Sequence, residues 1–278
     1  MSLPLAMSAP PPNLRIVPTE RLHPHEEHDT QRLLPLIDRL KHETVMINPP
    51  IVAPMDADGE DYVVLDGANR TSAFSELGFP HVLVQIAPYG SDYVQLETWH
   101  HVVCGWSIDD FLHHLDALAQ LQLHEGGSPQ AVALASIQFR SERLITLTTN
   151  SRSARERNRS LVEFVSVYQR NAVLQRTAIT EPGSIWSHHP DGIALVVFPR
   201  YRPSDVITAA REHAFIPPGI TRHIIQGRAL RVNYPLEVLR DPVTPLEEKN
   251  RQLVQWTERK FSQRQVRYYA ESTYQFDE

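Results

Sequence analysis

Residues 62–71 read Tyr-Val-Val-Leu-Asp-Gly-Ala-Asn-Arg-Thr, and this stretch bears most directly on the fold. The apolar run at its start predicts a buried β-strand, and Asp66-Gly67 marks a sharp turn. A helix is expected over residues 69–77, with Gly78 as its C-terminal stop. The stretch therefore predicts a strand that gives way to a glycine turn and then to a helix.

This turn carries the residue types that a phosphate site needs. A helix N-terminus presents backbone N–H groups and a partial positive charge, and Gly67 lets the backbone approach a ligand closely. Arg70 can add a forked contact to phosphate oxygens, and Thr71 can donate from its hydroxyl. Asp66 can hold Mg²⁺ or orient a hydroxyl group. From these residues alone, a plain strand-to-helix turn with a surface arginine is the commoner explanation, because short Gly-x-x-Arg strings arise by chance.

Helix and strand patterns alternate on both sides of the turn. Strands are expected at residues 14–18, 51–53, 62–65, 81–86 and 93–98, and a helix at 30–43. A capping-box pattern at 107–110 predicts another helix, and a terminal helix is expected at 243–265. The alternation predicts an α+β (mixed α/β) protein with a domain at 14–106 and a C-terminal α+β domain at 107–278. Residues 1–13, which are rich in proline, are expected to form a disordered tail rather than a signal peptide.

The composition argues against several classes of protein. The net charge of −6 disfavours a protein that grips nucleic acid through its overall field. No apolar run approaches the roughly 20 residues that a membrane span needs. The single cysteine, Cys104, excludes an internal disulfide and a cysteine-based zinc site, and it favours a cytoplasmic location. A Walker A loop is absent, so any phosphate chemistry must use another cradle.

The turn resembles a known phosphate-binding box. Residues 67–73, Gly-Ala-Asn-Arg-Thr-Ser-Ala, resemble the G-x-x-R-x-x-A box of ParB-type domains and the G-C-H-R box of sulfiredoxins. The likeness is closest to the D-G-H-H-R box of the free L-serine kinases, the branch with SbnI-like proteins. It implies a ParB/sulfiredoxin-like N-terminal domain, with the second α+β domain completing the cleft. It also implies that nucleotide phosphates are bound by Gly67, Ala68, Asn69, Arg70 and Thr71.

Three further stretches resemble the same branch, in the same order along the chain. Residues 23–27, His-Pro-His-Glu-Glu, are similar to an early segment that carries the catalytic base. Residues 97–100, Glu-Thr-Trp-His, and 215–223, Phe-Ile-Pro-Pro-Gly-Ile-Thr-Arg-His, are similar to segments that line the serine pocket. The resemblance implies catalytic roles for Glu26 and Asp66, and substrate contacts from Trp99, Thr221, Arg222 and His223.

The residues themselves leave alternatives open at these positions. Without the resemblance, Glu26 and Glu27 read as a solvated pair before a helix, and Trp99 reads as a core aromatic residue. The preference for Glu26 over Glu27 as the base rests on alignment alone. The adjacent histidines are interpreted as surface or hydrogen-bonded residues, because neighbouring side chains point to different sides of a helix or strand.

The sequence also departs from the family pattern. Ala68 stands where sulfiredoxins carry their cysteine, which argues against peroxiredoxin repair, and Ala68 and Asn69 replace the two histidines of D-G-H-H-R. The expected function is a nucleotide-dependent kinase acting on the hydroxyl of free L-serine or a similar small hydroxy compound. It would use ATP or ADP, with Mg²⁺ at Asp66, as a monomer or homodimer away from membranes. The alternatives are a ParB-like nucleotide-binding transcriptional regulator or DNA-binding protein, which the lost histidines favour, and a degenerate member that binds a metabolite without chemistry.

Overall fold

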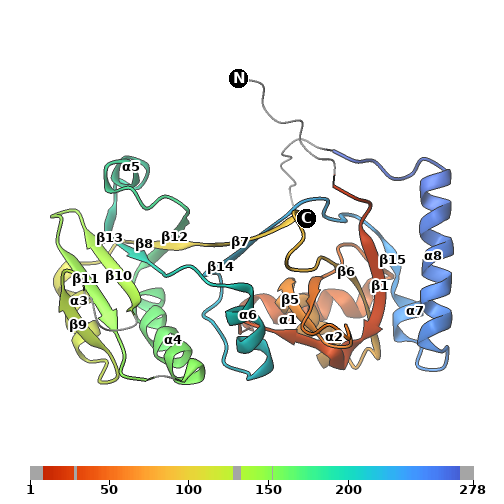
Figure 1. The fold of residues 1–278 in the computed structure, drawn as a ribbon, viewed down its shortest axis with the longest axis horizontal. Coiled ribbons are helices and arrows are strands. Elements are labelled where there is room, and N and C mark those ends of the chain that lie inside the picture. Colours follow the sequence, from red (N-terminus) through yellow and green to blue (C-terminus); the bar gives the residue numbers. More distant parts are fainter. Residues whose placement is uncertain (1–8, 28–29, 128–132, 152, 270–278) are drawn as a thin grey trace. The chain divides into compact units, whose positions relative to one another are not determined.

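The computed structural model describes residues 9–27, 30–127, 133–151 and 153–269, so residues 1–8 of the expected N-terminal tail lie outside its description. The fold is mixed α+β, as expected (Figure 1). The chain forms two compact units that are discontinuous in sequence. The first unit comprises residues 1–24, 28–95 and 223–278, and the second comprises 25–27 and 96–222.

These units divide the chain differently from the boundary expected near residue 107. The chain passes from the first unit to the second at residues 95/96 and returns at 222/223. Both crossings fall within strands, β7 (Val94–Thr98) and β14 (Thr221–Ile225), which pair in a two-stranded sheet. The terminal helix therefore belongs to the first unit, which no local sequence pattern could indicate.

The first unit is built on a five-stranded sheet with the order β1-β6-β4-β5-β2. Its strands are β1 (Asn13–Pro18), β2 (Leu22–Pro24), β4 (Ile51–Pro54), β5 (Tyr62–Asp66) and β6 (His81–Ile86). The pairings β1–β6 and β4–β5 are antiparallel, whereas β2–β5 and β4–β6 are parallel. A short pair joins β3 (Val45–Met46) to β15 (Tyr234–Pro235). The helical elements are η1 (Thr19–Arg21), α1 (Thr30–His42), α2 (Ala68–Glu76), α7 (Leu236–Arg240) and α8 (Leu246–Ser262).

The core of this unit explains why β5 and α2 hold a fixed position. The residues of β5 from Tyr62 to Leu65 are buried, as their apolar run predicted. Phe74 of α2 is 1% exposed and meets Phe79 edge-on, with 4.7 Å between the ring centroids. The turn between the two elements is therefore anchored on both sides by buried apolar side chains.

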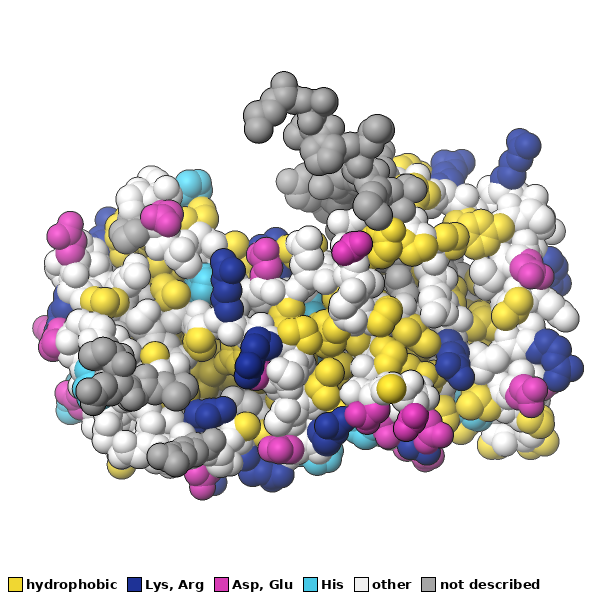
Figure 2. Space-filling view, in the orientation of Figure 1, with side chains coloured by type: hydrophobic (Ala, Val, Ile, Leu, Met, Phe, Trp, Pro, Cys, Tyr) yellow, Lys and Arg dark blue, Asp and Glu magenta, His cyan; other side chains and the backbone are white. Residues whose placement is uncertain are grey.

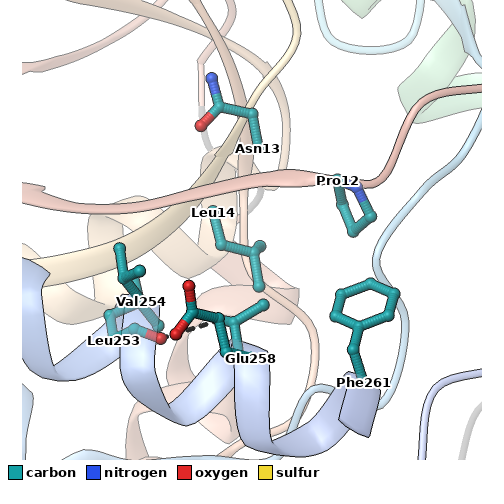
Figure 3. A pocket seen from close by; sticks show the side chains of 8 residues that line it. Pro12, Asn13, Leu14, Leu253, Val254, Glu258 and Phe261 are labelled. Carbon is teal, nitrogen blue, oxygen red and sulfur yellow. Dashed lines mark hydrogen bonds between the residues drawn. The ribbon is translucent and has the colours of Figure 1, made fainter. Parts of the chain in front are cut away.

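Helix α8 covers the outer edge of the sheet at β1. The side chain of Asn250 accepts a hydrogen bond from the Ile16 backbone N–H and donates one to the Ile16 carbonyl, both at 2.9 Å. Farther along the helix, a groove of about 380 Å³ separates the two elements, and Leu14 projects from β1 towards α8 (Figure 3). None of the residues that line this groove belongs to the expected site.

Replacing Asn250 by leucine is expected to lower the free energy of unfolding by about 1–3 kcal/mol. The change leaves the backbone N–H and carbonyl of buried Ile16 without their partner, and an unsatisfied buried group costs about this much. Urea denaturation measures the loss. The matched control is Gln255→Leu on the exposed face of α8, and equal midpoints for the two variants would contradict the prediction.

The second unit contains a six-stranded antiparallel sheet with the order β12-β8-β13-β10-β11-β9. Its strands are β8 (His100–Cys104), β9 (Gln122–Glu125), β10 (Ala133–Phe139), β11 (Leu144–Thr148), β12 (Val173–Thr177) and β13 (Gly192–Val197). Its helices are α3 (Ile108–Asp116), α4 (Ala154–Asn171), α5 (Pro182–His188) and α6 (Pro203–Arg211). The Ser107 side chain accepts from the Asp110 N–H at 3.0 Å, which confirms the predicted start of α3.

Strand β8 was not expected from the sequence. It begins directly after β7, with only Trp99 between them, so no turn signal separates the two strands. All five of its residues are buried, and they include His100 and His101. These histidines are hydrogen-bonded: His101 Nδ1 lies 2.8 Å from the Tyr168 hydroxyl, and His100 Nδ1 accepts from the Phe198 N–H at 3.1 Å. Burial lowers the pKa of His101 to about 3, so its ring is neutral.

Candidate functional site

The turn between β5 and α2 has a backbone conformation that favours glycine. Gly67 has a φ of 96° and a ψ of 31° and stands directly before α2, which begins at Ala68. A Cβ atom at this position would lie 3.0 Å from the Arg70 guanidinium and 3.2 Å from the Cα of Pro50. Both the left-handed backbone and the crowding therefore require glycine.

The N-terminus of α2 has the character of an anion site. Among the described residues no side chain caps this end of the helix. A helix start without such a cap directs its first backbone N–H groups and the positive end of its dipole towards an anion. The phosphate role expected for residues 67–71 is compatible with this geometry and stays a prediction.

Asp66 lies at the end of β5, where two arginines meet its carboxylate. Arg70 Nη2 donates to Asp66 Oδ2 at 3.1 Å, and Arg228 Nη2 donates to the same oxygen at 2.5 Å. Arg70 also donates through Nη1 to the Asn48 carbonyl at 2.9 Å. Within the described part of the chain, Asp66 Oδ1 has no hydrogen bond or ion pair, so one carboxylate oxygen faces no protein partner.

The residues around Asp66 fit a magnesium ion only in part. Mg²⁺ is often held by one or two carboxylates together with substrate phosphates and water. Asp66 Oδ1 can supply one such ligand. The described residues contain no group of three or more histidine, cysteine, aspartate or glutamate side chains that could hold a metal ion unaided. Any Mg²⁺ here must therefore take most of its ligands from phosphates and water.

Thr71 contributes an unsatisfied hydroxyl near this turn. The residue is 3% exposed, and its Oγ1 atom has no hydrogen-bond partner among the described residues. A buried hydroxyl without a partner costs free energy, so a bound ligand atom or water that reached it would stabilise the site. The atom is itself buried, so the ligand role expected for Thr71 stays a prediction.

In the second unit, Glu26 is held by a late segment of the chain. Its Oε2 accepts a hydrogen bond from the Gly219 N–H at 3.0 Å, and the Ile216 N–H donates to the His25 carbonyl at 2.9 Å. Glu26 is half-buried, whereas Glu27 is exposed. Glu26 is therefore the carboxylate whose orientation is fixed by a backbone N–H, and its role as the base stays a prediction.

Gly219 is itself fixed by its surroundings. It has a φ of 77°, and a Cβ atom there would lie 2.0 Å from a guanidinium nitrogen of Arg176 on β12. The peptide that holds Glu26 is thus packed under an arginine. No sequence pattern pointed to Arg176.

The expected substrate residues fall into three separate arrangements. The Arg222 guanidinium lies over the Trp99 ring at 4.1 Å from the centroid, which is cation–π geometry. Thr221 Oγ1 lies 2.8 Å from Nε2 of buried His25. His223 Nε2 lies 2.6 Å from the Tyr89 hydroxyl, and both of these residues belong to the first unit.

The strand geometry explains this division. Side chains alternate along β14, so Thr221 and His223 share one face and Arg222 points to the other. The structure therefore pairs Arg222 with Trp99, which is half-buried rather than a core residue. It does not group Arg222 with Thr221 and His223 as three consecutive residues would suggest.

Helix hydrophobicity and surface charge bear on whether the protein binds membranes or nucleic acid. Among the described helices, none is long and apolar enough to cross a membrane. Figure 2 shows Lys and Arg side chains interspersed with Asp and Glu on the face in view. The face shown therefore lacks the broad basic patch typical of proteins that bind nucleic acid through their field.

Comparison with known proteins finds solved structures that share the fold of this chain. No family model matches the chain. Structural neighbours include SbnI with C-terminal truncation from Staphylococcus aureus, with a TM-score of 0.72 and 20% identity, covering 90% of this chain and 97% of that one. A free serine kinase in complex with AMP gives a TM-score of 0.70 at 15% identity and covers 85% of this chain and 98% of that one. This chain shares their fold.

Two sequence relatives are also named serine kinases, and they match a shorter stretch of this chain. An ATP-dependent L-serine kinase from Staphylothermus marinus is 34% identical over 100 residues, which is 36% of this chain and 39% of that protein. One from Desulfurococcus mucosus is 31% identical over 84 residues, 30% of this chain and 32% of that protein. The matched stretches thus span less than two fifths of these curated relatives.

Proposed function

We propose that this protein is a nucleotide-dependent kinase that phosphorylates the hydroxyl of free L-serine or a similar small hydroxy compound. The observation that carries the proposal is the cradle at residues 66–71, where a strand-end aspartate precedes a left-handed glycine and a helix start without a side-chain cap. The similarity to named ATP-dependent L-serine kinases and the shared fold of a free serine kinase support the substrate class.

The cradle would bind the phosphates of ATP or ADP. Backbone N–H groups at the start of α2 and the Arg70 guanidinium would contact phosphate oxygens, while Gly67 keeps the backbone close to them. Asp66 would offer Oδ1 to Mg²⁺, which neutralises phosphate charge when it is bound. Phosphoryl transfer depends mainly on such positioning and charge neutralisation.

Residues outside the cradle would handle the acceptor. Glu26 would take the proton from the attacking hydroxyl, with its carboxylate oriented by the Gly219 N–H. Thr221, oriented by His25, would bind the small substrate. The Arg222 guanidinium, stacked on Trp99, would pair with the substrate's carboxylate. His223, beside Tyr89, is the remaining candidate for a substrate contact.

The direct test is a turnover assay with purified full-length protein. ATP and ADP, each with Mg²⁺, are supplied with L-serine, D-serine, L-threonine or L-homoserine, and the phosphorylated product is identified by mass spectrometry. We expect O-phosphoserine from L-serine with at least one nucleotide. Binding of nucleotide without any phosphorylated product would overturn the kinase proposal.

A regulator that binds nucleotide without turnover is the second candidate. Ala68 and Asn69 replace the two histidines of the family box, and alanine cannot donate a side-chain hydrogen bond. This candidate predicts nucleotide affinity without product and DNA binding that weakens as salt rises. Fluorescence anisotropy with labelled duplex DNA, run beside the turnover assay, separates the two functions.

A further inference from the structure

The loop that follows β14 is clamped to the sheet by one buried amide. Gln85 lies on β6 and is 4% exposed. Its Nε2 donates to the Gly227 carbonyl at 3.0 Å, and its Oε1 accepts from the Ala229 N–H at 2.8 Å. The amide nitrogen and the amide oxygen of Gln85 thus each form a hydrogen bond with one of the two residues that flank Arg228.

This clamp directs Arg228 to the cradle. The Arg228 guanidinium reaches Asp66 Oδ2, the same oxygen that Arg70 binds. Two guanidinium groups and one carboxylate leave one positive charge in excess, beside the positive end of the α2 dipole. Such an excess favours a bound anion.

Arg228 also retains donors for a ligand. A guanidinium carries five N–H donors, and within the described residues the Arg228 side chain bonds only to Asp66. Its side chain is 37% exposed, so a ligand can reach it. The ion pair with Asp66 therefore leaves other N–H donors of Arg228 for a ligand.

We propose that Arg228 is a phosphate-binding residue of the nucleotide site and that Gln85 positions it. The inference rests on the proposed nucleotide cradle, and it adds a second arginine that enters from a distant part of the chain. In this arrangement Asp66 orients Arg228 through Oδ2, while the remaining N–H groups contact phosphate oxygens. A purely structural ion pair that ties the loop to β5 is the competing explanation.

Binding measurements with ligands that differ only in phosphate separate these explanations. Calorimetry gives the affinities of adenosine, AMP and ADP for the full chain and for Arg228→Ala, Arg228→Lys and Gln85→Leu. We expect Arg228→Ala to weaken ADP binding about 10- to 100-fold and to leave adenosine binding unchanged. Arg228→Lys keeps the charge and should recover part of the loss. Gln85→Leu should weaken ADP in the same direction and raise the nucleotide KM more than it lowers kcat.

The matched control is Arg231→Ala, an exposed arginine on the same loop, which should leave ADP affinity within about twofold. An unchanged ADP affinity in Arg228→Ala, or equal losses for adenosine and ADP, would overturn the inference. If Arg228→Ala does not fold, Arg228→Gln replaces it under the same criteria.

Failure of this inference is distinguishable from failure of the proposed function. Inorganic tripolyphosphate binding to the full chain, and its weakening in Arg228→Ala, reports on the arginine without any turnover. If the wild-type protein binds ADP through Arg228 but makes no phosphorylated product, the kinase proposal fails and the assignment of Arg228 stands. If product forms normally in Arg228→Ala at low nucleotide, the kinase proposal stands and the assignment fails.

Discussion

Replacing Glu26 by glutamine is expected to reduce the turnover of L-serine by about a hundredfold to ten-thousandfold. Glutamine keeps an oxygen that can accept the Gly219 N–H, so the local geometry is preserved while the proton acceptor is lost. Steady-state kinetics at saturating nucleotide measures the effect. The loss should appear in kcat, with the affinity for nucleotide unchanged.

Glu27 provides the control for this substitution. It is exposed where Glu26 is half-buried, so Glu27→Gln should leave kcat within about twofold. The reverse result, with the loss in Glu27→Gln, would assign the base to the neighbouring residue.

Asp66→Asn should also depress kcat strongly, because it removes the negative charge that both arginines share and that Mg²⁺ would need.

Replacing Gly67 by alanine is expected to disable the cradle. The left-handed conformation costs an alanine about 1–2 kcal/mol, and the added Cβ would press on the Arg70 guanidinium and on the backbone of Pro50. A displaced cradle can lower turnover by about a hundredfold even when the chemical groups remain. Calorimetric affinity for ADP and the kinetic parameters for L-serine measure the loss.

Gly78, which follows the C-terminal end of the same helix, gives the matched control. It has a φ of 68°, but no atom lies within 4 Å of the position a Cβ would take. Gly78→Ala therefore has the same kind of backbone strain without the crowding. We expect a comparable decrease in stability with normal ADP affinity, and equal losses of affinity in the two variants would refute a specific role for Gly67.

The local parts of the site were predictable because their signals are local. An apolar run, an Asp-Gly pair and the start of a helix lie within ten residues, so strand, turn and helix could be predicted in order. The structure confirms the strand β5, the turn at Gly67 and the helix α2. The start of α3 at Ser107 followed for the same reason, because a capping pattern is contained in one turn.

The division into units and strand β8 could not be read in this way. The chain leaves the first unit and later returns to it. The point of return carries no boundary signal in the sequence, because it lies inside a strand with no linker composition. β8 follows β7 without glycine, proline or a polar turn, and the buried histidines in it resemble surface residues until their partners are known.

The sequence by itself determined the local backbone: a buried strand that ends at Asp66, a turn at Gly67 and a helix that carries Arg70 in its first turn. Only the tertiary structure decided which distant groups contact Asp66 and Glu26. Arg228 reaches Asp66 across 162 residues, and the Gly219 N–H reaches Glu26 across 193. Such contacts depend on how the sheet and its loops pack in space, and the spacing of residues along the chain does not predict that packing.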